Sequence, residues 1–131
     1  MKGKLYIRNT NGKGRGVFST RRIPAGEEFE ICPLLILPTG DYEVATSCLL
    51  TDYLFSIDRK KKLVALSLGF GSLYNHATDA NAAYHMDIPQ QRMIYYALED
   101  IPRGKEICIN YAGEKGKEPT EWFLSRRIVC K

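Results

Sequence analysis

The hydrophobic residues of this chain fall in short runs, which turn-forming residues separate every eight to twelve positions. An amphipathic helix would instead repeat its apolar positions at intervals of three and four over about a dozen residues. Short apolar runs bounded by turns are typical of domains built from several small sheets. The pattern therefore predicts a mainly β fold with little helix.

Several strands can be placed from the same pattern. Residues 5–7 are apolar and lead into the turn-rich stretch 9–12, and Gly16-Val17-Phe18 begins a second extended piece, so we expect two strands joined by a glycine-containing loop. Two hairpins are also predicted: residues 51–57 with 63–68, and residues 82–88 with 92–99 around 89–91.

The pattern Ile-Pro-x-Gly-x-Glu-apolar occurs twice, at residues 23–29 and 101–107. Proline and glycine at this spacing favour a tight turn, and the apolar residue after it favours a strand. The two segments are therefore predicted to form the same turn. They are too short and too isolated to indicate a repeat protein.

Residues 69–81 and the C-terminal end do not read as simple hairpins. Residues 69–81 begin Gly69-Phe70-Gly71 and end polar, and loops of this length often carry function. Beyond the polar stretch 112–119, Thr120 is expected to cap a short helix that carries Trp122 and Phe123. Aromatic residues of such a helix more often fill a core than line a binding site.

The composition narrows the functional classes. A chain of 131 residues with 44% hydrophobic and 26% charged residues predicts a single domain over residues 1–131. No apolar run approaches the roughly 20 residues of a membrane span, and the start Met1-Lys2-Gly3-Lys4 has no apolar run behind it as a signal peptide would. We therefore expect a protein that is not secreted and has no membrane partner, in a reducing, cytoplasmic location.

Charge and cysteine content add weaker constraints. The net charge of +4 is too small to demand a nucleic-acid partner, and the densest basic run, Arg59 to Lys62, has the sequence of a solvated hairpin tip, with substrate docking as the alternative. The four cysteines, Cys32, Cys48, Cys108 and Cys130, form no C-x-x-C pair. Ordinary thiols are expected and no metal site; one disulfide is the alternative.

Four separated pieces of the chain carry candidate chemistry. They are Gly14-Arg15-Gly16-Val17-Phe18, Asp52-Tyr53-Leu54-Phe55-Ser56, Asn75-His76 with Asn81, and the stretch from Gly104 to Tyr111. Each alone has an ordinary structural explanation, such as a common turn, local hydrogen bonding or packing. In this order, however, they resemble the SET domain of protein lysine methyltransferases, and most of all its compact, stand-alone viral members.

The resemblance implies a fold and a reaction. The fold would be the SET, β-clip-like arrangement of several short sheets, with the segment near Tyr111 passing the Asn75 loop in a pseudoknot-like crossing. The reaction would transfer methyl from S-adenosylmethionine to a lysine of a protein or peptide, such as a histone or another basic protein, and a chromatin substrate would place the protein in the nucleus. Compact members pair with themselves, which implies a homodimer.

The resemblance also assigns roles to residues. Gly14, Arg15, Gly16, Asn75, His76 and Tyr111 would bind the cofactor, with backbone groups and the Asn75 amide holding it. Tyr111 and Tyr53 would be catalytic. The lysine channel would be formed by Tyr53, Ile109, Trp122 and Phe123. Glu106 is expected to position its strand or, alternatively, to be an ordinary exposed carboxylate.

One channel position bears on the product. Many relatives carry Tyr or Phe two residues before the catalytic tyrosine, where this chain has Ile109. An isoleucine cannot hydrogen-bond a partly methylated amine, so more than one methyl should be added. The alternative is that Ile109 simply faces the core, because Ile107, Ile109 and Tyr111 alternate along one strand.

The chain departs from the family pattern in two places. Ala80 stands where a proline usually precedes the asparagine, and no cysteine cluster follows Tyr111, so Trp122 and Phe123 would have to complete the channel. Two other classes remain open: a non-catalytic SET-like module that binds a peptide or cofactor, and a nucleic-acid-binding β domain. The intact Tyr111 and Asn75-His76 weigh against the first, and the scattered basic residues against the second.

Overall fold

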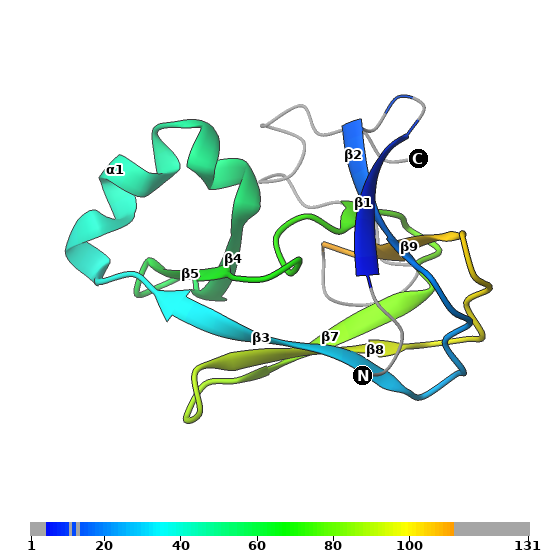
Figure 1. The fold of residues 1–131 in the computed structure, drawn as a ribbon. Helices are drawn as coiled ribbons and strands as arrows, with labels where there is room; N and C mark the ends of the chain where they lie inside the picture. The colour runs from blue at the N-terminus through cyan, green and yellow to red at the C-terminus, as the bar shows by residue number, and fades with distance from the viewer. Residues whose placement is uncertain (1–4, 11, 13, 112–131) are drawn as a thin grey trace.

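The computed structural model describes residues 5–10, 12 and 14–111. Its strands form two sheets that pack around one core (Figure 1). The first sheet has four strands in the order β1-β2-β9-β6, namely β1 (Leu5–Thr10), β2 (Gly14–Ser19), β9 (Glu106–Ile109) and β6 (Asn75–His76). The second has five in the order β4-β5-β3-β8-β7: β4 (Leu54–Asp58), β5 (Leu63–Ser67), β3 (Glu28–Ile36), β8 (Arg92–Ala97) and β7 (Ala82–Asp87). The mainly β prediction is confirmed.

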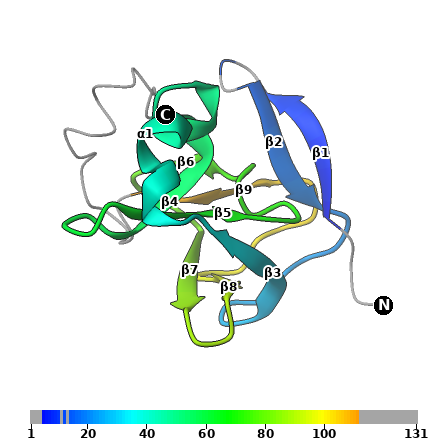
Figure 2. The same ribbon diagram turned by 90° about the vertical axis from the view of Figure 1, so that its left-hand side faces the viewer.

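The helical part is small and lies beside β4 and β5 (Figure 2). It consists of η1 (Thr39–Asp41), α1 (Tyr42–Thr46) and η2 (Leu49–Tyr53). The prediction that a strand begins at residue 51 is wrong, because residues 51–53 complete η2 and β4 starts at Leu54. These turns are too short to show a helical period. At the end of α1, the hydroxyls of Thr46 and Ser47 donate to the carbonyls of Tyr42 and Val44.

The two predicted hairpins are confirmed in their pairing and tips, although their strands are shorter than predicted. β4 pairs with β5, and β7 with β8, both antiparallel. Asp58 closes the basic tip of the first hairpin by accepting a hydrogen bond from the Lys61 backbone, and residues 59–62 are exposed there. The tip is thus a solvated turn, as its sequence indicates.

The core lies between the two sheets. Its fully buried members include Val17 from β2, Met93 and Tyr95 from β8, and Ile107 and Ile109 from β9. Each large apolar side chain buried in this way stabilises the fold by about 1.5–3 kcal/mol. Residues from both ends of the chain therefore hold the same core together.

The two segments with the Ile-Pro-x-Gly-x-Glu pattern form the same turn, as predicted. In each, the residue after the glycine donates to the proline carbonyl at 3.1 Å, and the glycines adopt positive φ, +87° at Gly26 and +81° at Gly104. A type II turn requires this conformation at its third residue. Ile23 and Ile101 also pair with each other through two backbone hydrogen bonds of 2.9 and 2.8 Å.

Other predictions concern residues that the structure describes only in part. Cys32, Cys48 and Cys108 are present as thiols, and Cys130 lies outside the described residues, as does the predicted terminal helix with Trp122 and Phe123. Within residues 5–111 that the structure describes, no helix is long and apolar enough to span a bilayer.

Candidate functional site

The site is built around β9, which brings distant segments together. β2 pairs with it antiparallel on one edge, and β6 pairs with it parallel on the other, with Asn75 opposite Cys108 and His76 opposite Ile109. The Asn81 side chain extends this pairing: its amide donates to the Glu106 carbonyl and its oxygen accepts from the Cys108 backbone, both at 2.9 Å. The predicted proximity of the Tyr111 segment to the Asn75 loop is therefore confirmed.

Asn75 and Glu106 form a polar junction beside the glycines of β2. The Asn75 amide donates to the Glu106 carboxylate at 2.7 Å and to the Arg15 carbonyl at 2.9 Å. A Cβ on Gly16 would lie 2.5 Å from a Glu106 carboxylate oxygen, so glycine is required there to admit this carboxylate. Glu106 thus positions two other strands, in line with the first of its two expected roles.

His76 fixes the backbone at Tyr111. Its side chain is 3% exposed, and Nδ1 accepts a hydrogen bond from the Tyr111 N–H at 3.0 Å. The two rings pack with their centroids 5.2 Å apart. The imidazole of His76 therefore holds Tyr111 in place.

The Tyr111 hydroxyl donates to the Tyr74 carbonyl at 2.7 Å. Its pKa is raised, chiefly by burial and further by the nearby Cys108, Tyr53, Glu106 and Asp52. The hydroxyl consequently stays protonated at neutral pH and is not a general base. With its hydrogen directed to Tyr74, the oxygen has lone pairs left to accept a hydrogen bond or C–H contact from a bound molecule.

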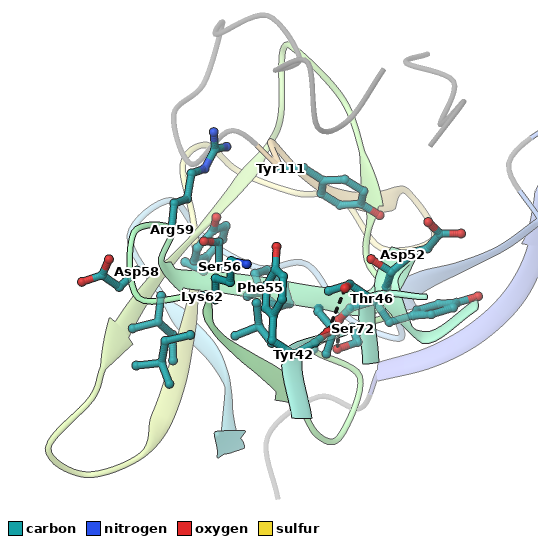
Figure 3. A pocket seen from close by; sticks show the side chains of 18 of the residues that line it. Tyr42, Thr46, Asp52, Phe55, Ser56, Asp58, Arg59, Lys62, Ser72 and Tyr111 are labelled. Carbon is teal, nitrogen blue, oxygen red and sulfur yellow. Dashed lines mark hydrogen bonds between the residues drawn. The ribbon is translucent and has the colours of Figure 1, made fainter. Parts of the chain in front are cut away.

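Tyr111 faces a cavity of about 610 Å³ (Figure 3). Residues from η2, β4, β5 and the 69–74 segment line it, and aromatic side chains supply much of the wall: Tyr42, Tyr53, Phe55, Tyr74, Tyr84 and Tyr111. Aromatic walls of this kind lower the exposure of a charged side chain to water, which lowers the cost of holding an amine neutral.

Charged residues stand at separate places on the rim. Figure 3 shows Asp52 on one side of Tyr111 and Arg59 on the other. Lys62 also lines the cavity, where its ammonium lies 3.3 Å from Glu43 and 5.7 Å from the centre of the Tyr42 ring. The cavity lining thus carries two acidic side chains, Asp52 and Asp58, and two basic ones, Arg59 and Lys62.

Five of the predicted cofactor residues lie on the first sheet: Gly14, Arg15 and Gly16 on β2, and Asn75 and His76 on β6. The sixth, Tyr111, follows β9, which lies between these two strands. Gly14 has φ +71°, and nothing lies within 4 Å of the position of an added Cβ, which leaves open space over this backbone. Both N–H groups of the Asn75 amide bond to the protein, so any cofactor contact of this amide would use its oxygen as an acceptor. Cofactor binding at Gly14, Arg15 and Gly16 therefore stays a prediction.

The substrate-channel residues divide into three groups. Tyr53 and Tyr111 both line the cavity, and the Tyr53 carbonyl accepts a hydrogen bond from Ser72 at 3.0 Å. Ile109 is 0% exposed within the core and is not among the described residues that line the cavity, so its channel role stays a prediction. Trp122 and Phe123 lie outside the described residues.

Sequence reasoning did not find Tyr74, Tyr42 or Tyr84 as cavity residues, nor Tyr74 as the acceptor of the Tyr111 hydroxyl. The one sequence signal for Tyr74 is its position directly before Asn75. Its role as an acceptor belongs to the backbone carbonyl, which the identity of the side chain does not reveal. Among residues 5–10, 12 and 14–111, no group of His, Cys, Asp and Glu could hold a metal ion.

Comparison with known proteins decides the family. The SET domain model matches residues 14–112, which include the glycine turn, the Asn75-His76 pair and Tyr111. The chain belongs to the SET domain family. This SET domain is also 35% identical, over 85% of its length and 75% of the relative's, to a Schizosaccharomyces pombe histone-lysine N-methyltransferase specific for H3 lysine-37.

Solved structures agree with the SET fold. A candidate histone methyltransferase of Plasmodium falciparum is 31% identical, with a TM-score of 0.62 over 85% of this SET domain and 99% of that chain. KRYPTONITE, solved in complex with mCHG DNA and SAH, is 23% identical with a TM-score of 0.63 over 85% of this chain and 24% of its own. The second likeness supports the fold alone.

Proposed function

We propose that this SET domain is a protein-lysine N-methyltransferase that uses S-adenosylmethionine, with Tyr111 as its central catalytic residue and Tyr53 beside it. The observation that carries the proposal is the Tyr111 hydroxyl, which is half-buried in an aromatic cavity and donates its hydrogen to the Tyr74 carbonyl. Its oxygen is therefore oriented to accept contacts from the reacting groups. The lysine methyltransferase named as a relative at 35% identity supports the same reaction.

The substrate amine must be neutral to attack. A free lysine with a pKa near 10.4 is about one part in a thousand neutral near pH 7.4, a cost of roughly 4 kcal/mol. Desolvation among Tyr53, Tyr84 and Tyr111 lowers that cost. Tyr111 then orients the amine through its oxygen, and the stabilisation of a correctly aligned pair is worth several kcal/mol.

The cofactor, when bound, supplies an electrophilic methyl group on a positively charged sulfur. We assign its binding to the backbone of Gly14, Arg15 and Gly16 and of the Asn75-His76 pair, next to Tyr111. The negative charge of Glu106, which lies against Gly16 and bonds to Asn75, supports a cationic ligand there. KRYPTONITE, a structural neighbour, was solved in complex with SAH, which supports a cofactor of this type.

We propose a basic protein segment, such as a histone tail, as the substrate. The histone-lysine methyltransferase to which the chain is 35% identical supports such a substrate. β4 is the last strand in its sheet, and an extended peptide can add to such an edge through backbone hydrogen bonds while its lysine enters the adjoining cavity. A histone substrate would place the protein in the nucleus.

Two finer features belong to this proposal. Addition of more than one methyl rests on the residue type at position 109 alone: Ile109 offers no hydrogen bond to a methylated amine, and its side chain lies in the core. A homodimer is supported by the exposed apolar residues of the helical region, Val44 at 74% and Leu49 at 72% exposed. A monomeric mass in light scattering at micromolar concentrations would refute the dimer.

Incubation with labelled S-adenosylmethionine and histones or protein extracts tests the reaction. We expect label on a lysine, located by mass spectrometry. The alternative of a non-catalytic binding module predicts no label, yet a cofactor-dependent rise in melting temperature, since a ligand at 100 times its Kd adds about 2.7 kcal/mol to the stability. Adenosine alone should raise the melting temperature less; an equal rise would contradict the assigned cofactor site.

A further inference from the structure

Glu30 of β3 is a partly buried carboxylate that the proposed reaction does not use. One of its oxygens accepts a hydrogen bond from the Tyr74 hydroxyl at 2.5 Å, and the other accepts one from the Phe70 backbone at 2.9 Å. Phe70 and Tyr74 stand near the two ends of the segment 69–74. The single carboxylate therefore ties both ends of this segment to β3.

The backbone of the segment is shaped around that carboxylate. Gly69 has φ +64°, and a Cβ there would lie 2.8 Å from a Glu30 carboxylate oxygen, so only glycine allows the approach. Tyr95 holds the middle of the segment, because its hydroxyl donates to the Gly71 carbonyl at 3.0 Å. Glu30 thus fixes residues 69–74 near both ends, whereas the Tyr95 hydroxyl, which also lies 3.0 Å from the Ser67 hydroxyl, contacts only their middle and makes no hydrogen bond to Tyr74.

Tyr74 connects the two hydrogen bonds of Glu30, here called the clamp, to the site. Its side chain is 1% exposed and packs against Tyr95, with ring centroids 4.8 Å apart. Its backbone carbonyl accepts the hydrogen bond from the Tyr111 hydroxyl. A displacement of the Tyr74 ring would therefore also move the acceptor on which the orientation of the Tyr111 hydroxyl depends.

We propose that Glu30 is a positioning residue for methyl transfer, acting through Tyr74 to direct the hydrogen of the Tyr111 hydroxyl away from the reacting amine. The inference rests on the proposed function. Without the Glu30 hydrogen bonds, the Tyr111 hydroxyl would rotate and donate its hydrogen to the substrate amine. It would then no longer accept a hydrogen bond from that amine. Burial and the charge of Glu30 raise the pKa of the Cys32 thiol to about 12 and that of the Tyr74 hydroxyl, which keeps both neighbours neutral.

Tyr74→Phe and Glu30→Gln test the inference in two backgrounds. In the otherwise native protein we expect kcat to fall about tenfold, with the Kd of the cofactor, measured by calorimetry, unchanged. In a Tyr111→Phe background, where no hydroxyl remains to be directed, the same changes should alter kcat by less than about twofold. Equal losses in both backgrounds would mean a merely structural role and would overturn the proposal.

Tyr95→Phe is the matched control. It removes a hydroxyl of the same kind, equally buried and bonded to the same segment, but outside the path from Glu30 to Tyr111. We expect it to lower the melting temperature and to leave kcat within about twofold of the native value. If Glu30→Gln fails to fold, Tyr74→Phe alone decides, because it deletes a single atom and keeps the ring.

A spectroscopic measurement separates this inference from the proposed function. In protein labelled with ¹³C at the tyrosine Cζ, the Tyr111 signal is the one lost in Tyr111→Phe, and it reports the hydrogen bond of that hydroxyl without any substrate. Tyr74→Phe and Glu30→Gln should shift it, and Tyr95→Phe should not. An unmoved Tyr111 signal would refute the clamp even if methyl transfer occurs, whereas shifted signals without methyl transfer would refute only the function.

Discussion

Residues 23–29 and 101–107 share one sequence pattern and one turn, and Ile23 pairs with Ile101. The strands that follow the two turns nevertheless have different surroundings. The first turn leads into β3, where Glu28 is exposed. The second leads into β9, where the equivalent Glu106 is partly buried and bonded to Asn75. Eight residues after each initial isoleucine stand Ile31, 52% exposed, and Ile109, 0% exposed.

The difference lies in what surrounds each turn. β9 is enclosed by β2, β6 and Asn81, so its side chains meet polar partners and core, and the strand runs directly into Tyr111. β3 pairs on both edges too, but one of its faces is exposed. The same local sequence thus specifies a turn, and only the distant partners specify a site.

The largest expected contrast concerns tyrosine hydroxyls. Tyr111→Phe keeps the ring but removes the oxygen, and we expect near-native folding and cofactor binding with methyl transfer reduced by two or more orders of magnitude, roughly 3 kcal/mol in the barrier. Tyr96→Phe, on β8 opposite Glu28 of β3, is the control and should leave turnover unchanged. Unchanged turnover in Tyr111→Phe, measured with labelled cofactor, would show that the catalytic assignment is wrong.

The equivalent glutamates provide the next contrast. Glu106→Gln removes the charge that receives the Asn75 amide, and hydrogen bonds to charged groups contribute about 1.5–3 kcal/mol, so we expect lower thermal stability and a roughly tenfold loss in kcat/KM. Glu28→Gln, at an exposed position, should change neither. Equal effects of the two substitutions would mean that the surroundings of β9 do not distinguish its glutamate.

The two turn glycines should behave alike in stability. An added Cβ meets nothing within 4 Å at Gly26 or at Gly104, so alanine is disfavoured only by the positive φ, by about 1–2 kcal/mol at each position. Urea unfolding should give equal free-energy losses for Gly26→Ala and Gly104→Ala. A clear inequality would show that the shared turn carries different strain in its two settings.

The smallest expected effect is on the product. If Ile109 leaves room for repeated transfer, the native protein should form di- or trimethyllysine, and Ile109→Tyr should shift the product toward one methyl while destabilising the core by about 1–3 kcal/mol through overpacking. Ile31→Tyr, at the equivalent exposed position, is the control. Mass spectrometry of a saturated reaction that stops at one methyl in the native protein, with no change in Ile109→Tyr, would defeat the hypothesis.

Much of the fold was predictable because its signals are local. The hairpin around Asp58 and the basic tip, the hairpin around residues 88–91 and the two proline-glycine turns all follow from adjacent residues. The helical turns of residues 39–53 were missed because each is shorter than the window in which a helical period can be recognised. Thr51 to Tyr53 were read as strand for that reason.

The sequence predicts which residues belong to the site but not the hydrogen bonds that connect them. Ordered motifs identified Tyr111, Asn75 and His76, which the fold does bring together. The bonds from Glu30 to Tyr74 and from Tyr74 to Tyr111 span 44 and 37 positions. No local pattern encodes such a pairing, and one of its acceptors is a backbone carbonyl that any residue would supply.

The placement of β9 between β2 and β6 also bears on when the protein becomes active. Strands that meet across so many residues form late, because the loop between them must first be closed. During synthesis the chain emerges from its N-terminus, so residues 14–19 and 75–76 wait for residues 106–111 before any site exists. A nascent chain stopped short of β9 should therefore be unable to methylate anything, the ribosome beside it included.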